Sequence, residues 1–177
     1  MTVYLKIVKI NCWTFNKYEE VVFINSVDKL ILREIGAVSR CIYSIGDIKY
    51  KNINLQRGQF IFLLRICENE GINLIELSNL MKVDKTTSTK AVQKLIKEGY
   101  LEKKEDSLDR RIWRLYPTFK GLEVYKYIAK EEEKSNETYY KNFSEKEKEE
   151  LVILLEKMRK NIEVTWNEIK KPKHSKK

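Results

Sequence analysis

The chain has 177 residues, with 35 Lys+Arg against 26 Asp+Glu, a net charge of +9 and 42% hydrophobic residues. This apolar content is enough for a folded core and argues against wholesale disorder. No apolar run reaches the 18 residues that a membrane span needs, and the lysine-interrupted N-terminus does not resemble a secretory signal. We therefore expect a cytoplasmic protein with no membrane partner.

The residues that metal sites and hydrolases use are scarce. The one histidine is His174, and the three cysteines, Cys12, Cys41 and Cys67, form no CxxC pair. A cluster of metal ligands or a His-based active site thus lacks side chains, and no phosphate-binding loop or nucleophile elbow is present. We expect free thiols, no metal, no cofactor and no enzymatic activity.

The first 25 residues stand apart from the rest. Val3, Leu5 and Ile7 alternate with polar neighbours, and residues 21–24 are apolar, which predicts a β-hairpin of unassigned role over residues 1–25. Ser26 resembles an N-cap, and apolar residues at helical spacing predict a long first helix to about Tyr50, in a segment that we place at 26–54.

A helix-turn-helix is predicted in the middle of the chain. Residues 55–69 are apolar on several sides, so we expect a central buried helix that Gly71 terminates. A short helix follows over 74–81, then a turn at 82–83. Asp84 is the expected N-cap of a helix that ends near Glu98, with Gly99 behind it.

Two alternating segments follow, residues 100–105 and 112–116, with a loop at 106–111 between them. They predict a β-hairpin. We expect Pro117 and Thr118 to end the second strand and cap the next helix. Residues 55–121 thus form a predicted winged helix-turn-helix, and the fold class is mainly α with a small β-hairpin wing (α+β).

The C-terminal part is predicted to hold two long helices, from Phe119 to about Asn142 and from Ser144 to Lys170, in a segment at 122–171 before a basic tail at 172–177. Ser144 and Glu147 form a capping-box pattern. The last helix carries an apolar stripe that is too extensive to be covered by the winged helix-turn-helix at 55–121, which we call the reader. We therefore interpret this stripe as a seam with a second subunit. Its residues are Leu151, Leu154, Leu155, Met158, Ile162 and Trp166.

The helix after Asp84 has the side chains of a DNA-reading element. Ser88, Ala91, Val92 and Leu95 share one face and are expected to pack inward. Hydroxyl, amide and ammonium groups, which bind base edges and phosphates, occupy the opposite face and its flanks. These candidate DNA contacts are Lys85, Thr86, Thr89, Lys90, Gln93 and Lys94. An ordinary solvated amphipathic helix is the alternative.

The loop of the hairpin adds a second candidate contact. Arg110 and Arg111 lie at its tip, where guanidinium groups suit a minor groove or phosphates. Asp109 is placed to hold Arg111 in an ion pair. A merely solvated hairpin tip is the alternative. Residues 52–121 carry 13 basic and nine acidic residues, whereas residues 122–167 carry nine basic and 11 acidic. The net positive charge thus lies on the predicted reader, as expected for a segment that binds phosphates.

From about Ser26 to Lys170 the chain resembles the MarR family of winged-helix transcriptional regulators. The family's wing pattern, Asp-x-Arg, an apolar strand and Leu-Thr-x-x-Gly, is similar to residues 109–121, with Pro117 in place of the usual Leu and Thr118 and Gly121 matching. Residues 84–101, with Leu95 and Gly99-Tyr-Leu101, are similar to the family's recognition helix and its exit.

The resemblance implies a homodimer held by the first and last two helices. It also implies a repressor that binds a pseudo-palindromic DNA operator, with small-molecule effectors acting in a cleft between the dimer region and the reader. The candidate cleft residues are Arg33, Arg40, Tyr43, Phe60 and Arg65, each of which has a structural role as its alternative. For a redox effector, Cys41 beside Arg40 is a better candidate than Cys67. A winged-helix module that binds protein rather than DNA is the alternative function.

Overall fold

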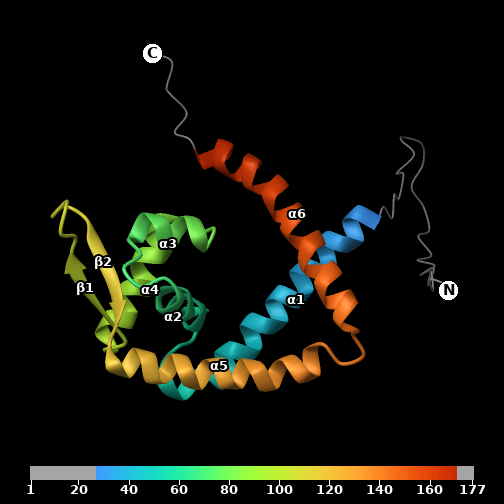
Figure 1. Ribbon diagram of the computed structural model, residues 1–177, viewed down its shortest axis with the longest axis horizontal. Coiled ribbons are helices and arrows are strands. Elements are labelled where there is room, and N and C mark those ends of the chain that lie inside the picture. Colours follow the sequence, from blue (N-terminus) through green and yellow to red (C-terminus); the bar gives the residue numbers. More distant parts are fainter. Residues whose placement is uncertain (1–26, 171–177) are drawn as a thin grey trace, which may run out of the picture. The chain divides into compact units, whose positions relative to one another are not determined.

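The computed structural model, shown in Figure 1, describes residues 27–170. These residues fall into two compact units, one ending at Ser44 and the other beginning at Ile45. Six α-helices, one 3₁₀ helix and a two-stranded antiparallel sheet make up this part of the chain. The predicted class, mainly α with a β-hairpin, is confirmed. Between residues 27 and 170, every helix is too short or too polar to cross a bilayer.

Helix α1 (Val27–Lys49) belongs to the first unit up to Ser44. All side chains from 27 to 44 are exposed or half-exposed, including large apolar ones such as Val27, Leu32 and Val38. The helix ends one residue before the predicted Tyr50. The predicted hairpin at 1–25, the cap at Ser26 and the tail at 172–177 lie outside the described residues.

The second helix begins later than predicted. After the 3₁₀ helix η1 (Lys51–Ile53), Asn54, Arg57 and Gly58 have positive φ angles of 57°, 57° and 69°. A right-handed helix cannot continue through such residues. The predicted start at Leu55 is therefore wrong, and α2 (Gln59–Glu68) follows Gly58, whose N–H donates to Asp47 Oδ1 at 3.0 Å.

The end of α2 agrees with the prediction within one residue. The helix ends at Glu68 with Asn69, its predicted last residue, as the C-cap, and Gly71 follows two residues later. Gly71 has a φ of +82° and donates its N–H to the carbonyl of Leu115 at 2.8 Å, so it joins the loop after α2 to the hairpin. An isolated bridge between Asn73 and Arg114 extends this contact.

The helix-turn-helix consists of α3 (Leu74–Leu80) and α4 (Lys85–Lys97). Asn73 and Glu76 form a reciprocal capping box at the start of α3, a pattern that the sequence contains and that our prediction missed. Asp84 caps α4 as predicted, and Gly99 follows its C-cap with a φ of +77°. The N-cap and the end of α4 are therefore the predicted ones.

The hairpin pairs β1 (Leu101–Glu105) with β2 (Trp113–Pro117), with Leu101 opposite Pro117. Tyr100 was predicted as the first strand residue, but it is buried and its hydroxyl donates to the carbonyl of Ile53 at 2.9 Å. Pro117, expected to stop the second strand, is its last residue, a position at the strand end where a missing N–H is tolerated.

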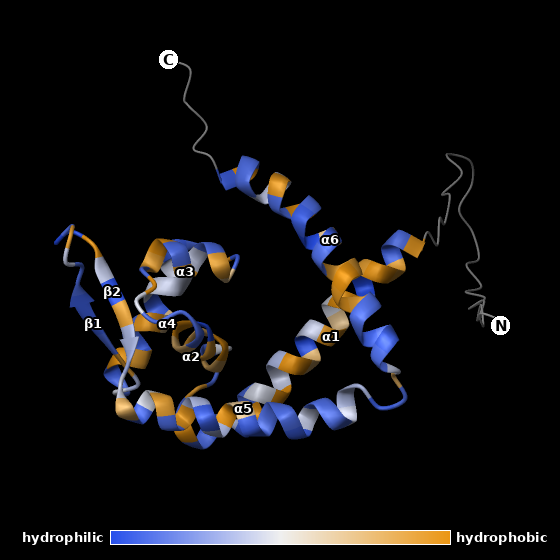
Figure 2. Cartoon of the chain, in the orientation of Figure 1, coloured by the Kyte–Doolittle hydropathy of each residue, from blue (hydrophilic) through white to orange (hydrophobic). Residues whose placement is uncertain are grey.

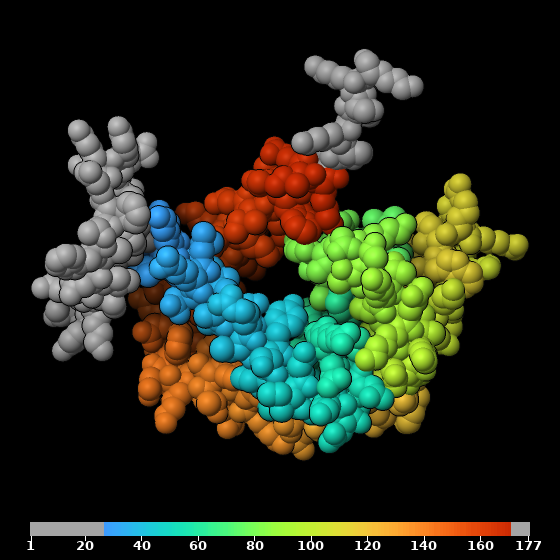
Figure 3. Space-filling view, turned by 180° about the vertical axis from the view of Figure 1, so that it is seen from behind, coloured from blue at the N-terminus to red at the C-terminus, as the bar shows by residue number. Residues whose placement is uncertain are grey.

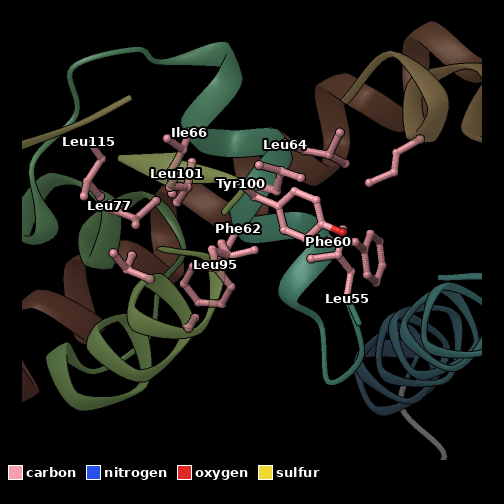
Figure 4. Close-up of a cluster of buried hydrophobic side chains, with 14 of the residues drawn as sticks. Leu55, Phe60, Phe62, Leu64, Ile66, Leu77, Leu95, Tyr100, Leu101 and Leu115 are labelled. Carbon is pink, nitrogen blue, oxygen red and sulfur yellow. The ribbon is translucent and has the colours of Figure 1, made fainter. Parts of the chain in front are cut away.

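One hydrophobic core lies among α2, α3, α4, the hairpin and α5 (Figure 4). Leu63, Ile66, Leu77, Leu95 and Ile128 have no exposed side-chain area. The core therefore fixes α4 and the hairpin to the same support, because both elements bury residues in it.

Helix α5 (Phe119–Tyr139) is capped by Thr118, as predicted, but ends before the expected Asn142. Helix α6 (Glu145–Lys170) begins with the predicted capping box, in which Ser144 N–H donates to Glu147 at 2.8 Å. None of its residues is buried within the described protomer. Its apolar side chains therefore remain uncovered.

Gly121 provides a test of the junction between α5 and the hairpin. A Cβ at this position would lie 2.1 Å from the carbonyl oxygen of Tyr100, a backbone atom that cannot move aside cheaply. We expect Gly121→Ala to lower the free energy of unfolding by about 3 kcal/mol through overpacking. Denaturant unfolding measures this loss.

Gly99→Ala is the matched control, because a Cβ there meets no atom within 4 Å and only the positive φ is strained. We expect a loss of about 1 kcal/mol for it. Equal losses for the two variants would contradict the close approach at Gly121.

Candidate DNA-binding surface

The N-terminus of α4 is fixed by its cap. Asp84 accepts a hydrogen bond from the N–H of Thr87 at 2.8 Å and another from the Thr87 hydroxyl at 2.6 Å. These bonds hold the pKa of the Asp84 carboxyl below its usual value. The Thr87 hydroxyl donates its proton to this cap. Although Thr87 is exposed, its hydroxyl therefore helps to position the helix and is not free to donate to a ligand.

The inward face of α4 is the predicted one. Ser88, Ala91, Val92 and Leu95 are all buried. Small residues at three of these positions let the helix lie close to its neighbours. The burial of this face turns the predicted reading residues toward solvent.

The outward face carries the predicted side chains in two states. Lys85, Thr86, Lys90 and Gln93 are exposed, whereas Thr89 and Lys94 are half-buried. The Thr89 hydroxyl donates to the carbonyl of Lys85 at 2.7 Å, which leaves its oxygen as an acceptor only. Gln93 and Lys90 make no hydrogen bond to any residue that the structure describes, so both can serve an external partner.

Lys97 is a residue that the sequence reasoning missed. It is exposed and follows Lys90 by seven residues and Gln93 by four, so it lies on the same side of α4. The helical spacing that selected Lys90 could have identified it. It extends the positive face to the last turn of the helix.

The hairpin loop contains the predicted ion pair. Arg111 donates to Asp109 through Nε at 3.0 Å and through a terminal nitrogen at 2.9 Å, and its backbone N–H also donates to Oδ1 at 3.0 Å. Its side chain is nevertheless 90% exposed. The guanidinium is thus held in one orientation while most of its surface remains open, and Arg110 beside it is also exposed.

A second arginine, Arg114, anchors the loop to the helices and was not predicted. Its Nε donates to Asp106 Oδ2 at 2.6 Å, and its NH1 group donates to the carbonyl of Gly71 at 3.1 Å. It also approaches Glu76, the capping residue of α3, at 3.5 Å. The hydrogen bond from Arg114 is the main reason that the pKa of Asp106 falls to about 2. We call these contacts the Asp106–Arg114 clamp; they join residues that lie far apart in the sequence.

The loop and α4 border a common depression. It has a volume of about 320 Å³, and Lys85 at the start of α4 and Arg111 of the hairpin both line it. The half-exposed Trp113 and the exposed Ile75 form part of its apolar wall. The two predicted groups of DNA contacts therefore meet on one side of the second unit.

The five predicted effector residues have different surroundings. Arg33, Arg40 and Tyr43 are exposed on the part of α1 that lies in the first unit. Phe60 is only 2% exposed and packs against Tyr50, with ring centroids 5.1 Å apart, and Arg65 pairs with Glu68. Phe60 is therefore a core residue in this conformation, and the cleft remains a prediction.

The cysteines differ in their exposure. Cys41 is exposed, whereas Cys67 is half-buried, and burial together with Glu70 and Glu68 raises the pKa of the Cys67 thiol to about 12. A thiol that stays protonated is a poor nucleophile. A redox role for Cys67 thus has no support, in agreement with the preference for Cys41 over Cys67 in the sequence analysis.

A helix-turn-helix whose second helix presents a polar, basic face, followed by a hairpin with arginines at its tip, defines the winged helix-turn-helix class. The comparisons agree with this class. The model of the MarR family matches residues 55–113. An uncharacterized HTH-type transcriptional regulator, YybA, of Bacillus subtilis (strain 168) is 43% identical over 141 residues, or 80% of this chain and 94% of the relative.

Solved structures give the same result. A MarR protein from Peptoclostridium difficile is 52% identical, with a TM-score of 0.77 over 88% of this chain and 100% of that chain. A putative MarR family transcriptional regulator from Listeria monocytogenes, complexed with 26mer DNA, is 40% identical, with a TM-score of 0.76 over 80% of this chain and 94% of that chain.

The chain belongs to the MarR family of transcriptional regulators. The resemblance noted from residues 84–121 is thereby confirmed. The family and the fold are those of regulators and not of enzymes.

The clamp between Asp106 and Arg114 predicts a pH dependence of stability. The pKa of Asp106 is lowered in the folded protein, so the clamp stabilises the fold at pH values above the ordinary carboxyl pKa of 3.8 and is lost as the pH falls toward about 2. We expect Asp106→Asn to lower the melting temperature near pH 6, and we expect the difference from the wild type to shrink between pH 4 and pH 2. Thermal melts across this range measure it.

Glu105→Gln is the control for removal of a neighbouring wing charge, because Glu105 is an exposed carboxylate at the end of β1, next to Asp106. A melting difference for Asp106→Asn that does not change from pH 6 to pH 2 would contradict the stabilising role of the charged clamp.

Proposed function

We propose that the protein binds double-stranded DNA sequence-specifically as a homodimer and regulates transcription, most simply as a repressor. The observation that carries this proposal is the common surface of α4 and the hairpin. The exposed Gln93, Thr86 and Lys90 can contact base edges in a major groove, while Arg110 and Arg111 can reach the adjacent backbone or minor groove.

Two other facts support DNA as the partner. The Listeria monocytogenes relative was solved with 26mer DNA, and it is 40% identical over 80% of this chain. The alternative, a module that binds protein through the same surface, requires an apolar centre with a polar rim. On α4 the centre of the outward face is instead hydroxyl, amide and ammonium groups.

The proposed dimer rests on the uncovered side chains of α6. Leu151, Leu154, Leu155 and Ile162 of the predicted seam are 37–64% exposed, and Met158 and Trp166 are half-exposed. Figure 2 shows hydrophobic and hydrophilic segments alternating along this helix. Such an apolar face on one protomer indicates burial by another protein surface, and a second copy is the partner that the family resemblance implies.

Exposed apolar residues of α6 also lie outside the predicted seam. Val152, Ile153 and Val164 are 57–64% exposed and lie on other sides of α6. The apolar surface of α6 is therefore wider than one narrow stripe, while most of its charged residues remain on the opposite side. We propose that the partner protomer covers this wider surface, and that the exposed apolar residues of α1 take part in the same dimer.

A dimer with two readers is expected to bind a pseudo-palindrome whose half-sites are centred roughly one helical turn, about 10 base pairs, apart or a multiple of it. Selection from a library of random 30-base-pair duplexes by the full-length protein tests this proposal. Enrichment of a two-fold related motif is the expected outcome. Recovery of duplexes without a shared motif would contradict it.

Arg111 tests the contribution of the hairpin. On the selected duplex we expect Arg111→Ala to weaken binding by roughly 1–3 kcal/mol and to reduce the slope of log K against log salt by about one for each wing. Fluorescence anisotropy over a salt series measures both quantities.

Lys126→Ala is the control, because it removes one exposed, ion-paired cation from α5, where Lys126 bonds Glu123 at 2.8 Å. It is expected to leave affinity and slope unchanged. An Arg111→Ala protein with wild-type affinity would remove the wing from the proposed interface.

Leu155 tests the dimer. We expect Leu155→Asp to dissociate it, because a carboxylate in the seam would be desolvated without a partner charge. Sedimentation velocity gives the mass of the species in solution. Leu155→Met keeps an apolar side chain of similar volume and is expected to remain dimeric. A wild-type protein that sediments as a folded monomer would overturn the proposed assembly.

A further inference from the structure

Leu108 is the most exposed large hydrophobic side chain between residues 27 and 170, at 95%. It lies in the loop between β1 and β2, at the tip of the hairpin. An exposed leucine by itself carries little information. This one differs because of how its backbone is held and because of its neighbours.

The backbone around Leu108 is fixed by Asp106. The Oδ1 atom of Asp106 accepts the N–H groups of Leu108 at 2.8 Å and of Asp109 at 3.0 Å, while its Oδ2 atom accepts Arg114 Nε at 2.6 Å. The loop is closed by a bond from Asp106 N–H to the carbonyl of Ile112 at 2.9 Å. The tip is therefore ordered before it meets a partner, which lowers the entropy cost of using Leu108 as a contact.

The two carboxylates beside Leu108 are each paired with an arginine, Asp106 with Arg114 and Asp109 with Arg111. Arg110 and Arg111 follow Leu108 in the loop, and Arg111 is oriented by Asp109 with a side chain that is 90% exposed. In the space-filling view the loop, in yellow, projects beyond the green helices of the reader (Figure 3). A single apolar side chain next to two exposed arginines is too small for a protein interface, but its chemistry matches that of a wedge in a DNA groove.

We propose that Leu108 inserts into the minor groove of the DNA next to the major groove read by α4, as an apolar contact beside Arg110 and Arg111, which bind the phosphates or the groove edges. This inference rests on the proposed function, because it needs the protein to bind duplex DNA. The partner surface is the groove floor and the sugar edges, which offer apolar area that a leucine side chain can cover.

Such a contact reads the shape of DNA rather than its hydrogen-bonding groups. The minor-groove floor of an A·T pair lacks the amino group that guanine places there, so a leucine fits more deeply over A·T pairs. Pyrimidine–purine steps unstack at low cost and accept a wedge most easily. We therefore expect Leu108 to give the protein a preference for A·T pairs and pyrimidine–purine steps at positions that flank the bases contacted by α4.

The test uses the full-length protein and the duplex that it enriches from the random library. We expect Leu108→Ala to bind this duplex about tenfold more weakly, the order expected when most of a partly buried leucine side chain is removed. Because the side chain is uncharged, the slope of log K against log salt is expected to stay at the wild-type value, which separates Leu108 from a phosphate contact such as Arg111.

Three further variants control the result. Leu108→Met keeps an apolar tip and is expected to retain affinity within about twofold, whereas Leu108→Asn is expected to lose at least as much as Leu108→Ala. Phe119→Ala removes another exposed apolar side chain, 82% exposed, from the start of α5 at the other end of the hairpin, and is expected to bind as the wild type. Thermal melts confirm that each variant is folded.

Asp106→Asn links the two parts of the inference. If the ordered turn is what presents Leu108, loss of Leu108 should matter less in the Asp106→Asn background, so the double variant should bind more tightly than the product of the two single effects predicts. Additive effects would overturn the positioning role of Asp106.

The outcomes separate this inference from the proposed function. A wild-type protein that enriches no motif overturns both. A wild-type protein that enriches a motif, with Leu108→Ala binding it equally well, overturns the role of Leu108 alone. Loss of preference confined to the flanking positions in a selection with Leu108→Ala supports the minor-groove contact.

Discussion

The burial of the inner face of α4 is the constraint on which the other features of the reader depend. Ser88, Ala91, Val92 and Leu95 pack into the core, and Ser88 and Leu95 have no exposed area. Because successive residues of a helix are separated by a fixed rotation, this burial decides that Gln93, Lys90 and Lys97 face outward. The hairpin enters the same core through Leu101 and Leu115, so its tip is held on the same support as α4.

The ion pairs of the hairpin orient groups more than they stabilise the fold. An exposed ion pair such as Asp109–Arg111 contributes about 0–1 kcal/mol to stability, a small share of a typical domain's total. Its geometric effect is larger, since three hydrogen bonds to one carboxylate fix both the backbone and the guanidinium of Arg111. The Asp106–Arg114 clamp does the same for the loop as a whole and joins it to the carbonyl of Gly71.

Much of the reader could be predicted from the sequence because its signals are local. The cap at Asp84, the glycine at 99, the burial of Ser88 and Leu95 and the pairing of Asp109 with Arg111 each depend on residues a few positions apart. The start of α2 could not be predicted, because the apolar residue Leu55 resembles a helix residue. The residue types at Asn54 and Arg57 do not indicate the left-handed φ angles that they adopt. The partners of Arg114 lie up to 43 residues away, so only the folded chain brings them together.

We propose that α4 and the hairpin together bind one specific DNA sequence. The most direct measurement is binding of the purified full-length protein to the DNA just upstream of its own reading frame, beside a scrambled duplex of equal length, each titrated against salt. We expect preferential binding to the upstream DNA, with a steep salt slope that reflects several phosphate contacts. Equal affinity for both duplexes, together with a failure to enrich any motif from random DNA, would contradict it.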